Sequence, residues 1–455
     1  KEYYFKEAIS WVYITDMNSF GARYIPNGFI FDVSGSSLFV DNEKKNYILG
    51  LLCSKISIVF MNILNPTMNF QVRDIKNIPI IFSETNKEEI DSLVQQNISI
   101  SKTDWDSFET SWDFEVNPLL DIDKQGQLPR TIESAYENWK EYANNNFAKL
   151  KENEERLNEL FIEIYGLKDE LAPEVSDKDI TIAKIFDDKK DIYDDIKGNQ
   201  YILTKEDVIK SFISYGVGCI FGRYSLDEKG LIYAGGEFDI NRYNKFRPVE
   251  DNIVLITDKE YFEDDLVNRF VEFVKLSFGQ ENLEVNLKFI ADSLKGSGTP
   301  REKIRNYFVN DFYKDHVQMY KKTPIYWLYD SSAGKTKRQS QNGFKALVYM
   351  HRYDADTTGK VRIDYLHKVQ RIYERRMDFL KDDIAHNKDA RQVAESEKEL
   401  EKIIKQVKEC KDYDEKIGHI ALSRIDIDLD DGVKVNYDKV QTDDKGKKFK
   451  ILAKI

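Results

Sequence analysis

The chain has 455 residues, a formal net charge of −12, 41% hydrophobic residues and 33% charged residues. Such a composition is typical of a soluble globular chain of roughly three domains, and without an apolar run of about 18 residues nothing in it is expected to span a membrane. Three widely spaced cysteines and five histidines without a ligand spacing argue against a disulfide framework and a zinc site, so we expect a reducing, cytoplasmic setting.

The first 83 residues predict a module that mixes strands and helices. Residues 23–33 predict a turn that leads into a strand, and residues 46–63 predict a mostly buried helix. This helix is expected to stop at Asn65 and Pro66, because proline cannot continue a helix and restricts the residue before it. Residues 69–73 then predict a short polar strand.

Residues 84–200 predict a connector followed by a long helical spacer. The stretch 84–130 has no clear period, and its spaced aromatic residues are typical of a loop pinned to a neighbouring surface. Over 131–166, apolar residues recur at steps of about three and four, which predicts one long helix. Gly166 is a suitable residue to end it. The acidic, turn-rich residues 167–200 predict a domain boundary.

Residues 201–322 predict a mainly helical domain, and residues 323–455 predict a C-terminal domain that begins with two strands around a basic loop. Two helical patterns, at 363–386 and 390–412, meet at a short turn and predict a helical hairpin. The tail, 425–454, alternates like strands and predicts a β tail. The four parts together predict an α+β, multi-domain chain.

The C-terminal part carries a basic island on an acidic protein. Between Ser331 and Met377 there are eleven lysines and arginines against four acidic residues, a local excess of seven positive charges. This charge distribution favours a site for a polyanion, and a solvated surface loop is an equally open interpretation. Five of its cations are candidate contacts: Lys335, Lys337, Arg338, Lys345 and Arg352.

Three short motifs resemble ligand loops and depart from them. The glycines of 216–222 lack the dinucleotide spacing, which favours close helix packing. Gly334-Lys-Thr336 lacks the earlier glycine of a phosphate loop, since Tyr329 stands there. The acidic run 426–432 lacks the calcium-loop positions and favours a strand that ends in a turn. We therefore expect no cofactor or metal site in this chain.

Asn65-Pro-Thr-Met68 approaches the motif with which amino-methyltransferases grip the target amine and stack on the flipped base. Thr67 replaces the second proline and Met68 the aromatic residue, so the sequence argues against catalysis here. Asn65, Asn69, Gln71 and Arg73 are still suited to pair with base edges, because amide and guanidinium groups bind purines bidentately. A helix cap followed by an edge strand is the equally open structural alternative.

Longer strings carry a resemblance to a known family. Examples are Arg23-Tyr-Ile-Pro-Asn-Gly-Phe-Ile-Phe-Asp32 and Asp104-Trp-Asp-Ser-Phe-Glu-Thr-Ser-Trp-Asp-Phe114. With these strings the chain resembles the C-terminal half of PglX, the adenine-specific DNA methyltransferases of BREX phage-defence systems. The chain begins with Lys1 rather than methionine, which also suggests part of a longer protein. The other matching stretches are 64–70, 164–170, 222–227, 299–302, 324–354 and 430–437.

The resemblance implies mixed α/β target-recognition modules joined by long helical spacers, which bind double-stranded DNA. It also implies that S-adenosylmethionine and catalysis belong to an N-terminal part outside this chain, and that other BREX proteins are partners. The alternative function is a protein-interaction platform that docks other defence subunits or a DNA-mimicking phage inhibitor. Ten residues are candidate DNA contacts: Arg23, Asn65, Asn69, Gln71, Arg73, Lys335, Lys337, Arg338, Lys345 and Arg352.

Overall fold

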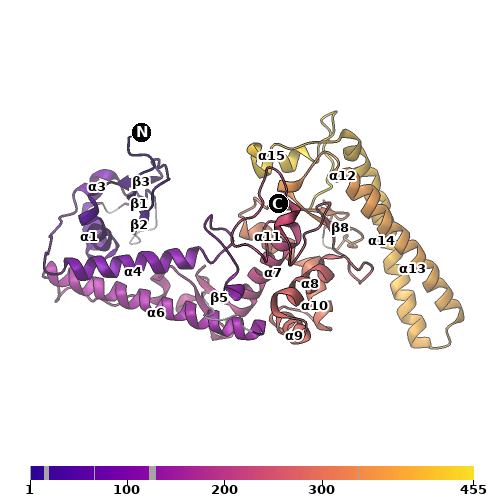
Figure 1. Ribbon diagram of the computed structural model, residues 1–455, viewed down its shortest axis with the longest axis horizontal. Helices are drawn as coiled ribbons and strands as arrows, with labels where there is room; N and C mark the ends of the chain where they lie inside the picture. Colours follow the sequence, from indigo (N-terminus) through magenta and orange to yellow (C-terminus); the bar gives the residue numbers. More distant parts are fainter. Residues whose placement is uncertain (1, 15–19, 66, 122–129, 337) are drawn as a thin grey trace. The chain divides into compact units, whose positions relative to one another are not determined.

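The computed structural model describes residues 2–14, 20–65, 67–121, 130–336 and 338–455 (Figure 1). It divides into two compact units. The first holds Lys1–Asp106 with Lys140–Thr204, and the second holds Ser107–Trp139 with Lys205–Ile455. Helices dominate, and the sheets have two or three strands. The predicted α+β, multi-domain fold is confirmed, while the four-part division at 83, 200 and 322 stays a prediction.

The first unit begins with a three-stranded antiparallel sheet. Strand β1 (Ala8–Val12) lies between β2 (Ala22–Ile25) and β3 (Gly35–Leu38). The predicted strand at 28–33 is wrong, because that stretch is a loop and the polar segment Gly35–Leu38 pairs with β1 instead. Pairing with a distant strand outweighs local β propensity here, as is common in sheets.

The predicted helix at 46–63 is two helices, α1 (Asn42–Cys53) and α2 (Lys55–Leu64). Ser54 between them is extended, and the Lys55 amide donates to the Asn158 side chain instead of continuing the helix. The predicted stop is confirmed, since α2 ends at Leu64. In the part of the chain that the structure describes, no single helix is long and apolar enough to cross a membrane; α1 and α2 together pass that test but are bent by 71°.

Two long helices shape the rest of this unit. Residues predicted as a connector form α4 (Lys87–Trp105), whose pattern is weak because its buried residues are only Ile90 and Val94. The predicted spacer is confirmed as α6 (Ile132–Ile164), which belongs partly to each unit. Gly166 follows its last residue after one turn residue, with φ at +68°, where glycine is favoured. Short parallel strands β4 (Lys184–Phe186) and β5 (Ile202–Thr204) follow.

Residues 201–322 were predicted to be mainly helical, and in the second unit, which resumes at Lys205, five helices lie between 205 and 319. Most of the glycine-rich stretch lies in α7 (Lys205–Phe221), where a Cβ on Gly216 would come within 2.9 Å of Phe273, so this glycine allows close packing. The sheet runs in the order β6 (Ile253–Leu255), β8 (Lys345–Tyr349), β7 (Tyr326–Asp330), all antiparallel. The helices are α7 (Lys205–Phe221), α8 (Leu266–Phe278), α9 (Leu283–Ser293), α10 (Pro300–Asn310) and α11 (Phe312–Met319).

After β8, the short helix α12 (Thr357–Lys360) and one wide helical turn, Val361–Leu366, lead into the hairpin. The predicted hairpin is confirmed as α13 (His367–His386) and α14 (Ala390–Ser423), which lie side by side (Figure 1).

The predicted β tail is wrong. The segment Gly432–Lys439 is a helix, α15, and the Asn436 side chain ties its first turn to the carbonyls of Asp428 and Gly432. Among the described residues after 424, the only strand-like features are single bridges such as Tyr329↔Leu452. The tail alternates polar and apolar residues as a strand does. These residues pack against the hairpin and β7, however, and form no continuous series of strand hydrogen bonds.

Candidate nucleic-acid interface

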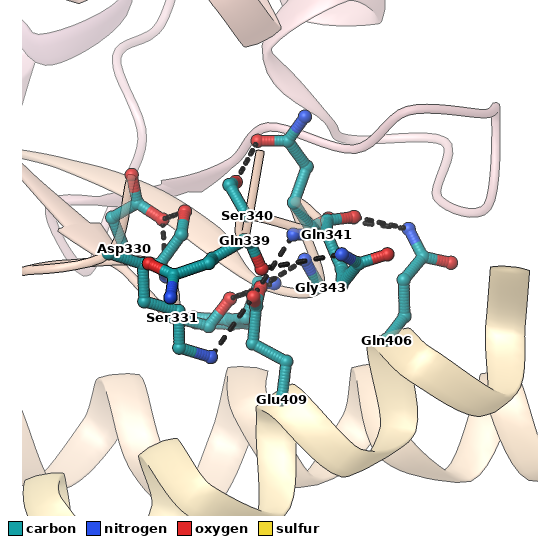
Figure 2. Close-up of polar contacts among 12 residues, drawn as sticks. Asp330, Ser331, Gln339, Ser340, Gln341, Gly343, Gln406 and Glu409 are labelled. Atoms are coloured by element: carbon teal, nitrogen blue, oxygen red, sulfur yellow. Dashed lines mark hydrogen bonds and ion pairs between the residues drawn. The ribbon is translucent and has the colours of Figure 1, made fainter. Parts of the chain in front are cut away.

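The basic loop between β7 and β8 is held from below by one buried carboxylate, Glu409 of α14 (Figure 2). Its two oxygens accept hydrogen bonds from both ends and the middle of the loop. The donors are Ser331 Oγ at 2.7 Å, Gly343 N at 3.0 Å, Gln341 N at 3.0 Å and Lys335 Nζ at 3.2 Å.

Burial alone would raise the pKa of Glu409, but these hydrogen bonds outweigh it and hold the pKa below its usual value. The carboxylate is therefore charged and fully engaged at neutral pH. The neighbouring Gln406 side chain donates to the Gln341 carbonyl at 3.2 Å, and the Tyr373 hydroxyl donates to the Gly343 carbonyl at 2.9 Å. Both hairpin helices thus fix the loop at Ser331, Gln341 and Gly343, so the backbone is ordered at these positions.

The structure separates the eleven cations of the basic island into two kinds. Six of them have acceptors inside the protein, and Lys337 lies outside the described residues. The six pairings are Lys335 with Glu409, Lys345 with the Val309 carbonyl, Arg352 with the Phe221, Val249 and Glu250 carbonyls, Lys360 with Asp354, Arg362 with Asp414, and Arg376 with Glu399.

Two of the predicted DNA contacts, Lys345 and Arg352, therefore stabilise the fold by donating hydrogen bonds to backbone carbonyls. Lys345 is buried, and its ammonium group donates to the Val309 carbonyl at 2.6 Å. The Arg352 guanidinium donates to three backbone carbonyls, at 2.8 to 3.1 Å. Because a cation that satisfies buried carbonyls leaves them unpaired when it moves, these side chains are poor candidates for phosphate contact.

Four cations of the island remain exposed and form no ion pair with another residue that the structure describes: Arg338, Lys368, Arg371 and Arg375. Of these four, Arg338 is the one predicted as a DNA contact, and that role stays a prediction. Lys335 lies beside it, and its charge is largely offset by Glu409. The exposed part of the loop therefore presents fewer positive charges than the sequence alone indicates.

Sequence reasoning missed Lys450, which lies against the loop. Gly334 has φ +80°, and a Cβ there would come within 2.7 Å of Lys450 Cδ. The contact arises because the last residues run beside β7, where the Asp330 amide donates to the Ile451 carbonyl at 3.1 Å. Lys450 is exposed and ends a lysine-rich run, 445–450, which was the available signal in the sequence.

In the first unit, the candidate base readers lie on a closed turn and not on a strand. The Asn65 side chain donates to the Asn69 carbonyl and to the Asp74 carboxylate, both at 2.6 Å. Asp74 also accepts from the Gln71 amide at 2.9 Å, which starts the helix α3 (Val72–Lys76). The predicted strand at 69–73 is wrong, because these side-chain bonds stabilise a helix start in its place.

This turn decides which side chains are available. Asn65 is fully used within it, since its carbonyl oxygen accepts from the Thr67 amide at 3.1 Å. The side chains of Asn69, Gln71 and Arg73 are exposed. Asp74, the nearest carboxylate in sequence, is occupied by Asn65 and the Gln71 amide. Arg73 forms no ion pair with any residue in the described ranges.

Arg23 is exposed on β2 and is tied to its own unit. Its guanidinium reaches Thr181 Oγ1 at 3.5 Å. It also lies near Glu154 of α6, where burial raises the pKa of the carboxyl to about 7 and the charge of Arg23 opposes that shift. Arg23 therefore already favours the charged form of a half-buried acid.

The chain matches no family model. It is similar along almost its whole length to adenine-specific methyltransferases. Over 446 residues it is 42% identical to the adenine-specific methyltransferase PglX of Lacticaseibacillus casei (strain Zhang), covering 97% of this chain and 35% of that protein. Over 458 residues it is 35% identical to the adenine-specific methyltransferase BrxX of Escherichia coli O9:H4 (strain HS), covering 96% and 36%.

The predicted resemblance to PglX is thus confirmed. The chain spans about a third of the length of these curated relatives. Among the described residues, no group of His, Cys, Asp or Glu side chains is arranged to hold a metal ion.

Proposed function

We propose that this chain is the DNA target-recognition region of a site-specific adenine DNA methyltransferase that acts in the cytoplasm in BREX phage defence. The similarity to PglX over 97% of the chain carries the proposal. Double-stranded DNA is the partner that suits exposed arginines and lysines on an otherwise acidic protein, because phosphate contacts position a protein and a few polar side chains then read bases. Other BREX proteins are further partners.

Methyl transfer belongs, in this proposal, to a part of the protein outside this chain. That part would bind S-adenosylmethionine and flip the adenine. The turn at Asn65 supports this division, since its amide group is bonded to the Asn69 carbonyl and to Asp74 and cannot grip a target amine. This chain would choose the site.

Substitution of the exposed cations in and beside the basic loop tests the proposed DNA binding. In the full-length protein, Arg338→Gln with Lys450→Gln should weaken binding to every duplex alike, because phosphate contacts carry no sequence information. The slope of log K against log salt should fall by roughly one unit per lost contact. Adding Lys335→Gln and Lys337→Gln tests the rest of the loop, and Lys335 should add little because Glu409 already neutralises it.

The matched control is Lys388→Gln with Lys398→Gln, which removes the same charge from exposed positions at the hairpin end. Fluorescence anisotropy over a range of salt concentrations measures both variants. Equal loss in the two variants would mean a general charge effect, and unchanged binding in the loop variant would make the loop a solvated surface feature.

The second candidate is the protein-interaction platform, and one observation favours it. The first unit exposes apolar side chains beside its sheet, and two of them, Phe29 and Ile30, line a hollow of about 350 Å³. Exposed apolar patches of this kind mark interaction surfaces. If the intact protein binds an acidic DNA-mimicking inhibitor but no duplex, this function replaces the first.

Arg73 provides a test of base reading. Arg73→Ala in the full-length protein should relax the methylated sequence at one position, at a cost of about 1–3 kcal/mol against the cognate site. The side chain is exposed on α3, and Asp74 is engaged elsewhere, so loss of a stabilising ion pair does not explain the change. Sequencing of methylated sites decides: an unchanged motif with a lower protein yield would give Arg73 a structural role. The same measurement on Gln71→Ala, two residues before Arg73, tests whether Gln71 also reads a base.

A further inference from the structure

One face of α13 carries a stripe of three cations, Lys368, Arg371 and Arg375. The spacing of three and four residues places them on the same side of the helix over two turns. All three are exposed, while Val369 and Tyr373 between them are buried in the core. The stripe therefore points away from the protein interior.

The ion pairs of the hairpin set these residues apart. Arg376, which faces α14, binds both oxygens of Glu399 at 2.9 and 3.2 Å. Arg362, one turn before the helix, binds both oxygens of Asp414 at 2.8 and 3.2 Å. In the described part of the chain, by contrast, Lys368, Arg371 and Arg375 have no carboxylate partner. Glu374 and Asp378 lie on the same helix, and neither forms an ion pair with the stripe.

The stripe is also joined to the basic loop. The Tyr373 hydroxyl, on the helical turn that lies between Arg371 and Arg375, donates to the Gly343 carbonyl at the end of the loop. Lys368 is held over the Phe262 ring, 5.0 Å from its centre, which limits the positions its ammonium group can take. Loop and stripe thus belong to one fixed body, so the backbone that carries the three cations needs no ordering when it binds.

We propose that this stripe is a second phosphate-binding surface, which binds the backbone of the same DNA duplex as the loop. The proposal rests on the proposed function. At a rise of 1.5 Å per residue, Lys368 and Arg375 lie about 10 Å apart along the helix, and a duplex whose axis is parallel to the helix rises by about three phosphates of one strand over this length. Arginine is suited to this role because its planar group binds phosphate oxygens in pairs.

The test is the triple variant Lys368→Gln, Arg371→Gln and Arg375→Gln in the full-length protein. Its salt slope for duplex binding should fall by about two to three units, and its affinity near 100 mM salt should fall at least about tenfold, for every sequence alike. The control, Arg391→Gln, Lys398→Gln and Lys408→Gln, removes the same charge from exposed positions of α14. It should change affinity less than about twofold, and Arg371→Lys with Arg375→Lys should keep the slope.

Each other result has a definite meaning. Salt-dependent binding by the wild type that the triple variant retains would overturn the stripe and leave the proposed function standing. Equal losses in the triple variant and its control would also overturn it, because only net charge would matter. No duplex binding by the wild type would reject the proposed function itself, and the stripe with it. Circular dichroism of each variant confirms that the fold is kept.

Discussion

Glu409→Ala should lower the free energy of unfolding of the second unit by about 3–5 kcal/mol, as expected when a buried, paired charge is removed. Glu409 is only 2% exposed, and its loss leaves Lys335, a hydroxyl and two backbone amides without their acceptor. The loop should lose its fixed backbone, so affinity for DNA should fall even though no basic residue has changed. Urea unfolding measures the first effect and anisotropy the second.

The effect of Glu409 also has a defined pH dependence. The folded-state pKa is lowered below the unfolded value of 4.5, so the stabilisation is present above about pH 4.5 and is lost as pH falls through the folded pKa. The difference in stability between wild type and Glu409→Ala should therefore shrink in acid. Glu401→Ala, an exposed position on the same helix, should change stability by less than about 0.5 kcal/mol. A Glu409 variant as stable as this control would show that the loop does not depend on the carboxylate.

Asp265→Ala should destabilise the second unit by a similar amount, about 3–5 kcal/mol, without a specific effect on DNA binding. Asp265 is 0% exposed and forms a buried ion pair with Arg305 of α10. Its carboxylate also accepts from Thr257 Oγ1 and from the Asn268 amide, both at 3.0 Å, which caps α8. Removing it leaves the Arg305 charge buried and unpaired.

This variant separates stability from binding. The hydrogen bonds and the ion pair of Asp265 join it to Thr257, Asn268 and Arg305, which lie outside the loop, so the folded protein should keep its affinity for duplex, in contrast to Glu409→Ala. The double variant Asp265→Leu with Arg305→Met should recover much of the lost stability, since apolar replacement of a buried pair is often tolerated. If Asp265→Ala weakens binding as much as Glu409→Ala at equal folded fraction, then the binding loss reports general destabilisation and not the loop.

The long helices with a buried stripe were predictable, whereas the short elements and α4, whose buried residues are only Ile90 and Val94, were not. Both α6 and the hairpin α13–α14 repeat apolar residues every three or four positions over many turns, so their pattern is local and redundant. The segment 69–73 and the tail at 432–439 are too short for such a pattern. Asp74 and Asn436 decide them as helices, through bonds to residues several positions away.

The candidate site was also predictable only in part. Residue types and charge placed a basic island between Ser331 and Met377. They could not show which cations remain available, because their partners come from elsewhere in the chain. Lys335 meets Glu409, which is 74 residues away, and the Gly334 contact with Lys450 is more distant still.

Residue types and local patterns therefore predicted the α+β class, the helices α6, α13 and α14, the local excess of positive charge and the resemblance to PglX. Each of these depends on residue types or on neighbours within one or two turns. The tertiary structure alone decided the fixed backbone of the basic loop, the structural roles of Lys345 and Arg352, and the exposure of the α13 stripe. The physical reason is that a charge is available to a ligand only when the fold supplies it with no internal acceptor, and acceptors are brought together by folding.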